Sequence, residues 1–449
     1  MHLTIKEVGA LALSKNIFLT ELREHLDNAY ERLKQRYIDT SVLGVARAYE
    51  AKNIVDKELW TLFCAIVDFQ VPVVKVLLPM LKGLITEMEG QGLKFIDLVY
   101  ELDAAKRVLS SFKWLNRDRV GFKHRLLKLN HILCLFNSMN SVLERWGSLG
   151  NLVQVAYRKS LASGTKEPIE LVVKSLAKAL RSGSCPKYCE NYSPENKDEC
   201  KYFSRIIPNP KRNSAFKRIC LFLRWMVRPY PDLGLWIFID KTHLIASIDE
   251  GVLRTISRVF DVNIKSQSWK AALKVTEIFR SINRSDPTKY DYVFSRPAIM
   301  KYCTKDYSRS RCYCCPLNEI CKSAHKPKLL TTKPPCSSKE QQILQKFTQY
   351  LQGKIQIDKI LTEYQVNDHY IDAVIHQVNC RWIIVEIKTG KLEYQALGQV
   401  VLYRKLFKEV MHTKPEAIII CKTAPPKLRE ACEVDLGIKI VTLSEIGVN

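Results

Sequence analysis

The 449-residue sequence lacks several features that would define its class at once. It contains no uninterrupted run of about 18 apolar residues, which argues against a membrane-spanning protein. Its first twenty residues lack the ordered basic, apolar and cleavage regions of a signal peptide, so we expect a cytoplasmic protein. No period of about 20–50 residues recurs, which disfavours a solenoid. Aliphatic and aromatic residues occur throughout, which excludes disorder as the main state.

Acidic residues are scarce relative to basic ones. The chain has 70 Lys and Arg against 46 Asp and Glu, a formal net charge of +24. A surplus of this size predicts a polyanionic partner, most simply double-stranded DNA, rather than a membrane or a small-molecule substrate. A basic surface with no dedicated partner is the alternative, and the oligomeric state is left open. The fifteen cysteines form an odd count, which in a cytoplasmic chain favours metal ligation over a disulfide framework.

The pattern of apolar residues divides the chain into two parts. Up to about residue 325, apolar side chains recur every three to four positions and predict an almost entirely helical domain. Residues 322–338 are rich in Lys, Pro and Ser, as is typical of a linker. We therefore expect a helical domain over 1–321, a linker over 322–338 and a second domain over 339–449. The predicted helices of the first domain lie within 56–85, 122–146, 169–180, 214–227, 250–260 and 268–282.

The second domain combines helical and β-branched segments. Residues 370–376 and 381–388 are β-branched runs separated by a polar turn near Asn379, which predicts two paired strands. Helices are expected at 340–351 and 392–407, and further strands at 417–421 and 438–443. This alternation predicts a compact α/β domain with a mixed sheet flanked by helices, so the whole chain is expected to be multidomain.

The two paired strands carry the most informative constellation of polar residues. Asp372 lies in YIDAVI, and WIIVEIK supplies Glu386 and Lys388 fourteen residues later. Side chains two apart on a strand share a face, so Glu386 and Lys388 project together while Ile387 points into the core. If the strands pair, Asp372 lies beside them. Two carboxylates and one ammonium can hold Mg²⁺ or Mn²⁺ and orient a hydrolytic water.

This D…ExK arrangement resembles the PD-(D/E)XK nuclease superfamily in a reduced form. The resemblance implies that Asp372 and Glu386 bind the metal and that Lys388 positions or activates the water. The following helix contains Gln399 and Tyr403, a Q-x3-Y pattern similar to that of the RecB-like branch, in which the Gln supports the site or contacts DNA. Many members add a helical carboxylate, for which the candidates here are Glu340 and Glu363.

A second constellation, CTKDYSRSRCYCCPLNEIC, spans residues 303–321. Four thiolates in a C-x8-C-x2-C-x5-C pattern can hold one tetrahedral ion or one iron–sulfur cluster. The ending resembles the [4Fe–4S] loop of endonuclease III and adenine-mismatch glycosylases, although the first spacing is two residues longer, which leaves zinc as an alternative. Cys314 is interpreted as a spare thiol. The four predicted ligands are Cys303, Cys312, Cys315 and Cys321; a second group, Cys185, Cys189 and Cys200, is unassigned.

A helical domain followed by such a loop resembles the helix-hairpin-helix DNA-glycosylase superfamily. Residues 207–236, 243–260 and 285–294 closely resemble a functionally unassigned, archaeal-type family within it, and fainter similarity extends over 30–321. The resemblance implies catalytic roles for Asp249, at a helix start, and for Lys217, the amine that attacks C1′ in bifunctional members. A Lys can do so only if its pKa falls towards neutrality. The alternatives are helix N-capping for Asp249 and a phosphate contact for Lys217, because residues 205–228 contain seven basic side chains and no acid.

Together these patterns predict a DNA-repair endonuclease that recognises a damaged or abnormal base and hydrolyses a phosphodiester bond with Mg²⁺. One alternative is a bifunctional glycosylase and AP lyase that acts through Lys217 and has an accessory nuclease. Another is a nucleic-acid-binding protein in which neither site is active.

Overall fold

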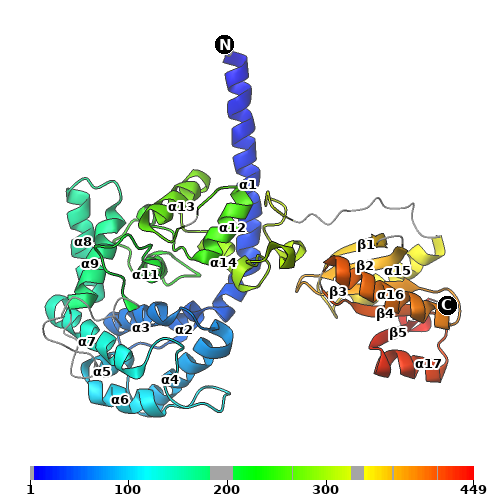
Figure 1. Cartoon of the computed structure of the whole chain (residues 1–449), viewed down its shortest axis with the longest axis horizontal. Coiled ribbons are helices and arrows are strands. Elements are labelled where there is room, and N and C mark those ends of the chain that lie inside the picture. The colour runs from blue at the N-terminus through cyan, green and yellow to red at the C-terminus, as the bar shows by residue number, and fades with distance from the viewer. Residues whose placement is uncertain are drawn as a thin grey trace. The chain divides into compact units, whose positions relative to one another are not determined.

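The computed structural model of the chain describes residues 5–182, 206–264, 266–324, 338–366, 369–411 and 413–448. The chain forms two compact units, one made of Met1–Met300 and Glu319–Ser323 and the other of Lys301–Asn318 and Ala324–Asn449. The first is helical and the second contains a mixed five-stranded sheet (Figure 1). The predicted boundary at residue 321 differs from this division, because residues 301–318 cluster with the second unit. Most of the predicted linker lies outside the described residues.

The helical unit confirms the predicted secondary-structure class over its described residues. None of the helices in the described part is both long and apolar enough to cross a membrane. Within the described residues, two short elements interrupt the series: η1 (Val73–Leu77), a π-helix, and η3 (Lys241–His243), a 3₁₀ helix. The α-helices are α1 (Ile5–Thr40), α2 (Val42–Ala48), α3 (Ile54–Val67), α4 (Leu78–Gly90), α5 (Phe95–Tyr100), α6 (Leu102–Ser111), α7 (Leu129–Trp146), α8 (Leu149–Ala162), α9 (Pro168–Ser182), α11 (Lys217–Val227), α12 (Glu250–Phe260), α13 (Trp269–Ile282) and α14 (Asp291–Ile299).

One predicted helical stretch is divided in the structure. The apolar pattern over 56–85 predicts a continuous helical segment, whereas α3 ends at Val67 and η1 and α4 follow it. Pro72 stands directly before η1 and has no backbone N–H to continue a helix. Gln70 adopts a left-handed conformation with φ of 56°. The spacing of apolar residues therefore did not reveal that the helix ends at Val67 and that a new one begins after Pro72.

Two arginines of α11 are buried in an ionic network. Arg224 pairs with Asp232 at 3.0 Å, and Arg228 pairs with Asp232 at 2.6 Å and with Asp286 at 2.8 Å. Both arginine side chains are at most 3% exposed. Buried charges of this kind persist only with close partners, because an unpaired charge in the interior is costly. These two members of the basic stretch over 205–228 are therefore neutralised within the fold and are not available to phosphates.

The second unit is built on a sheet with strand order β1-β2-β3-β4-β5. The first three strands are antiparallel, and β3, β4 and β5 are parallel, which gives the predicted mixed sheet. Strand β1 was not predicted. The unit contains η4 (Tyr307–Arg309), η5 (Cys312–Cys314), α15 (Ser338–Leu351), β1 (Ile357–Val366), β2 (His369–Gln377), β3 (Trp382–Ile387), α16 (Tyr394–Met411), β4 (Glu416–Cys421), α17 (Pro426–Glu430), η6 (Ala431–Asp435), β5 (Ile438–Thr442) and η7 (Ser444–Ile446).

Helices pack on both faces of the sheet. On one face, Trp382 and Ile384 of β3 pack with Val400 and Phe407 of α16. On the other face, the alternate residues of β3, including Val385, pack with α15. A strand buried on both faces contains apolar residues at successive positions, as WIIVEI does. A carboxylate within such a strand is therefore exceptional, and Glu386 is only 3% exposed.

Candidate active site

The pairing of β2 with β3 brings Asp372, Glu386 and Lys388 to one end of the two strands. Ala373 pairs with Val385 in an antiparallel register, so Asp372 lies opposite Glu386. Lys388 follows the last residue of β3, and its Nζ lies 2.8 Å from Oε1 of Glu386. The backbone N–H of Ile387 donates a hydrogen bond of 2.6 Å to Oδ2 of Asp372. The three side chains thus occupy one small region of the sheet.

The two carboxylates destabilise each other's charged forms. Burial, and then the charge of Glu386, raises the pKa of Asp372 from 3.8 to about 7. Burial also raises the pKa of Glu386, although its hydrogen bond with Lys388 opposes this. Burial alone would lower the pKa of Lys388, but the hydrogen bond to Glu386 and the charges of Glu386, Asp372 and Glu340 together outweigh it, and the pKa is raised. Lys388 is therefore an ammonium at neutral pH.

A divalent cation fits this set of residues. Within the part of the chain that the structure describes, Oε2 of Glu386 is a buried atom without a hydrogen-bond partner. Buried polar atoms normally have a partner, and a carboxylate oxygen with none in the protein is suited to bind a cation or a water. Mg²⁺ prefers carboxylate oxygens and typically takes one or two of them, leaving its other positions to water and phosphate. Asp372 and Glu386 would hold such an ion.

Two further glutamates act on the same carboxylates. Glu340, in the first turn of α15, has a charge that raises the pKa of both Asp372 and Glu386. Glu363 of β1 raises the pKa of Glu386 as well. The strand register places Glu363 between residues that pair with Ile371 and Ala373. Both candidates for an additional carboxylate are therefore near the site.

Helix α16 contributes Gln399 and Tyr403. Burial, and then the charges of Glu386 and Asp372, raises the pKa of Tyr403 to about 12, while its hydrogen bond with Gln399 opposes the shift. Gln399 is half-buried, and its Oε1 is without a partner among the described residues. The two side chains are four residues apart and so lie on one helical face. The predicted Gln399 is therefore hydrogen-bonded to Tyr403, whose pKa the charges of Glu386 and Asp372 raise.

In the helical unit, Lys217 and Asp249 come together although 32 positions separate them in the sequence. Lys217 begins α11, and its Nζ lies 2.9 Å from Oδ2 of Asp249, with each side chain about one-third exposed. Asp249 is also the N-cap of α12, because its Oδ1 accepts a 2.9 Å hydrogen bond from the N–H of Val252. Burial would lower the pKa of Lys217, but Asp249 and Asp68 outweigh it and raise the pKa. The direction is opposite to that required of an attacking amine.

The four cysteines of the predicted cluster lie in described segments of both units. Cys303 is buried, and Cys312, Cys315 and Cys321 are half-buried. By the contact division, Cys321 is grouped with the helical unit and the other three with the second unit. The Sγ of Cys321 donates to the carbonyl of Arg258 at 3.6 Å. The unassigned group Cys185, Cys189 and Cys200 lies outside the described residues.

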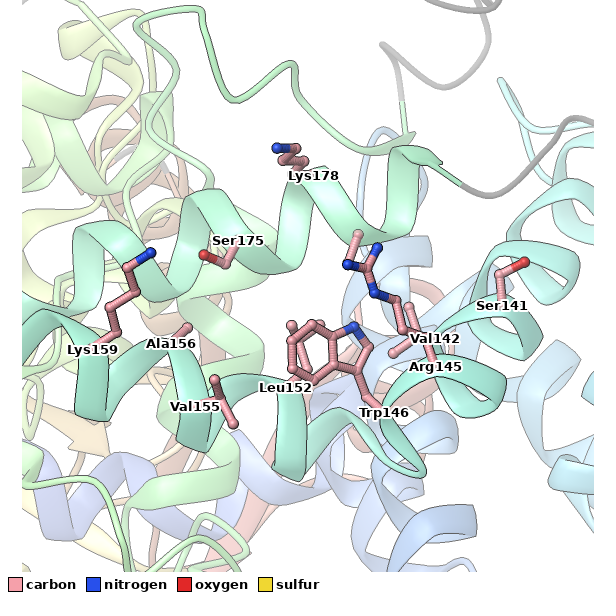
Figure 2. Close-up of a pocket in the computed structure, with 11 residues that line it drawn as sticks. Ser141, Val142, Arg145, Trp146, Leu152, Val155, Ala156, Lys159, Ser175 and Lys178 are labelled. Carbon is pink, nitrogen blue, oxygen red and sulfur yellow. The ribbon is translucent and has the colours of Figure 1, made fainter.

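A pocket of about 320 Å³ lies among α7, α8 and α9 of the helical unit. Figure 2 shows the side chains of Arg145, Lys159 and Lys178 around it, with the ring of Trp146 between the helices. The guanidinium carbon of Arg145 is 5.5 Å from the centre of that ring. The residues that line the pocket include three cations and no acid. This pocket suits an anionic group but contains no set of catalytic side chains, and the sequence patterns did not indicate it.

Comparisons with other proteins give two structural likenesses and one family. A repair endonuclease from Pyrococcus abyssi is 16% identical, with 25% of this chain and 49% of that chain covered and a TM-score of 0.21. An EndoMS–dsDNA2 complex is 12% identical, with 25% and 48% covered and a TM-score of 0.21. The chain thus spans about half the length of these solved structures, and none of the curated proteins matches it. Residues 44–300, more than half of the chain, match the model "Protein of unknown function (DUF2400)", and the chain belongs to this family.

Proposed function

We propose that this chain is a divalent-metal-dependent DNA endonuclease whose second unit hydrolyses a phosphodiester bond. One observation carries the proposal: Asp372, Glu386 and Lys388 converge at one end of the β2–β3 pair, and the two carboxylates have raised pKa values there. Carboxylates whose pKa values are raised by burial and by each other are typical of sites that bind a cation or take part in a reaction. The arrangement agrees with the resemblance to PD-(D/E)XK nucleases.

The protein's own residues have separate roles in this reaction. Asp372 and Glu386 would hold Mg²⁺ or Mn²⁺, which when bound polarises the phosphodiester and offsets the charge that develops on it. The N–H of Ile387 fixes the orientation of Asp372. Lys388, with a raised pKa, donates hydrogen bonds to the attacking water or to a phosphate oxygen and does not serve as the general base. Gln399 supports the site through Tyr403.

Charge supports double-stranded DNA as the partner. A formal net charge of +24 favours a polyanion, and cationic contacts to phosphate supply affinity that does not depend on base sequence. The pocket with Arg145, Lys159 and Lys178 is one place on the helical unit that can accept a phosphate. We propose that the helical unit binds damaged duplex. Tethering to it then raises the effective concentration of the nuclease unit at the lesion.

The pair formed by Lys217 and Asp249 supports a second candidate function, a glycosylase with lyase activity. An amine must lose its proton before it attacks a sugar carbon, and Asp249 at 2.9 Å is a neighbouring acceptor. Because Asp249 raises the pKa of Lys217, this candidate requires bound DNA to separate the pair. The test is incubation of the chain with lesion-containing duplexes and borohydride in EDTA. A covalent adduct in the native chain and none in Lys217→Met supports this candidate, whereas absence of an adduct on every duplex rejects it.

The four-cysteine segment is proposed to hold a [4Fe–4S] cluster, with zinc as the alternative. The support is the C-x8-C-x2-C-x5-C spacing, because four thiolates within nineteen residues match the ligand number of either group. Nine Lys and Arg against two acidic residues between positions 296 and 333 favour a role near phosphates. Absorbance near about 400 nm in the purified chain identifies iron–sulfur ligation, and its absence together with bound zinc identifies the alternative.

The nuclease proposal is tested with labelled duplexes that carry deaminated, oxidised or abasic sites, each with Mg²⁺ or EDTA. We expect cleavage in Mg²⁺ that leaves 3′-hydroxyl ends, and no cleavage in EDTA. Lys388→Ala should abolish cutting while retaining binding to damaged DNA. Lys405→Ala, which removes an exposed amine of α16, is the matched control and should cut normally. Normal cutting by Lys388→Ala, or sugar-fragment ends in EDTA, refutes the hydrolytic assignment.

A further inference from the structure

Cys314, His376 and Cys380 form a compact group elsewhere in the second unit. One potential ligand atom from each residue lies within 4.8 Å of the other two. Cys314 belongs to η5, His376 is near the end of β2, and Cys380 lies in the turn between β2 and β3. His376 is four residues along β2 from Asp372, which corresponds to about 13 Å at the rise of a strand. The group is thus separate from the carboxylate site.

His376 is oriented as metal-binding histidines are. Its Nδ1 lies 2.8 Å from Oδ2 of Asp358 on β1, and its side chain is only 4% exposed. A carboxylate on Nδ1 fixes the tautomer that leaves the Nε2 lone pair available to a metal. In the described part of the chain, Nε2 is buried and has no nitrogen or oxygen partner, and the thiol of Cys380 lies against it. Trp382 packs at 4.2 Å between ring centres and further restrains the imidazole. A buried, oriented imidazole nitrogen therefore adjoins two thiols.

The thiol of each cysteine contacts the backbone carbonyl of the other. The Sγ of Cys314 donates to the carbonyl of Cys380 at 3.8 Å, and the Sγ of Cys380 donates to the carbonyl of Cys314 at 3.6 Å. Cys380 also lies 3.6 Å from the hydroxyl of Tyr302. It has a φ of 64°, a conformation that residues other than glycine rarely adopt. A side chain is thus placed at a turn position where glycine would be the residue expected.

From this geometry we propose that Cys314, His376 and Cys380 bind a Zn²⁺ ion, with a fourth position open to water beside Tyr302. Two thiolates and one imidazole are ligands that zinc accepts in tetrahedral sites. Zn–S bonds of about 2.3 Å place two sulfur ligands about 3.7 Å apart, so movements of about 1 Å bring the three atoms to bonding positions. Each thiol loses its proton to solvent on binding, and no oxidant or reductant is needed. The ion would fasten residues 301–318 to the sheet.

The first test is zinc content of the full chain by elemental mass spectrometry. Cys380→Ala should lose one zinc equivalent relative to the native chain. Cys432→Ala removes another buried thiol of the same unit that lies outside the group, and it should lose none. Equal zinc in Cys380→Ala and the native chain, or the same loss of zinc in Cys432→Ala, overturns the proposal.

A second test avoids any variant that fails to fold. In the native chain, zinc should protect Cys314 and Cys380 from alkylation, and EDTA should expose both. Equal alkylation of Cys314 and Cys380 with and without EDTA would overturn the proposal. Asp358→Ala tests the positioning carboxylate: competition with a chelator should show zinc held about 10–100-fold more weakly, whereas unchanged affinity removes Asp358 from the site. These outcomes are independent of DNA cleavage, so they stand or fall separately from the nuclease proposal.

Discussion

Replacing Asp372 with Asn should make the metal-free chain more stable at neutral pH. The pKa of Asp372 rises from 3.8 to about 7, a difference of about 3 that corresponds to about 4 kcal/mol at 1.36 kcal/mol per unit. Partial exposure screens the charge and reduces the expected gain to about 1–3 kcal/mol. Asn has the same shape, and its oxygen can still accept the hydrogen bond from the Ile387 N–H. The substitution therefore removes the charge and little else.

The effect of Asp372→Asn has a defined pH window. The unfolded chain releases the Asp372 proton near pH 3.8, whereas the folded chain retains it until about pH 7. Between these values the folded state binds more protons, so the free energy of unfolding of the native chain falls as pH rises. Below about pH 4 the two chains should be equally stable. Above about pH 7 the advantage of Asp372→Asn should reach its plateau.

The assay is thermal unfolding of the second unit between pH 5 and 8, in EDTA and in Mg²⁺. Mg²⁺ should stabilise the native chain more than Asp372→Asn, because the cation binds the ionised pair. Asp435→Asn removes an exposed carboxylate and should show neither effect. If the native chain gained stability relative to Asp372→Asn as pH rose, or if Mg²⁺ stabilised both equally, the account of the site's electrostatics would be wrong.

Two further predictions concern the helical unit. Asp249→Asn should retain the N-cap of α12, whereas Asp249→Ala should lower the free energy of unfolding by about 1 kcal/mol in thermal denaturation; equal losses would reject the capping role. Arg228→Met should cost about 3–5 kcal/mol in the same assay, because it leaves the buried carboxylate of Asp286 without its guanidinium and removes one of the two arginines that pair with Asp232. A loss below about 1 kcal/mol would mean that the network contributes little.

The strands that carry the candidate site could be predicted because their pattern is local. YIDAVI and WIIVEIK are short β-branched runs, and the structure forms β2 and β3 over nearly the same residues. Strand β1 was missed because charged residues such as Asp358 and Glu363 interrupt its apolar pattern. Among the described strands it lies at the edge of the sheet, next to β2, so such residues are tolerated there. The missed strand brings Glu363 near Glu386 and places Asp358 on Nδ1 of His376.

Contacts between residues far apart in the sequence could not be predicted from local sequence patterns. Cys314 and Cys380 are 66 positions apart, and only the strand register brings His376 near them. A count of basic residues likewise cannot separate Arg224 and Arg228, which are buried in ion pairs, from cations that face solvent. Burial and pairing depend on tertiary packing, which neither spacing nor composition specifies.

Binding of Mn²⁺ to the full chain, measured alongside cleavage of a labelled duplex, tests the central claim most directly. We predict that Glu386→Gln loses one bound ion per chain and loses cutting with it, because it removes the carboxylate that is opposite Asp372 and hydrogen-bonded to Lys388. A Glu386→Gln chain that bound as much Mn²⁺ as the native chain and still cut DNA would contradict the assignment of this site.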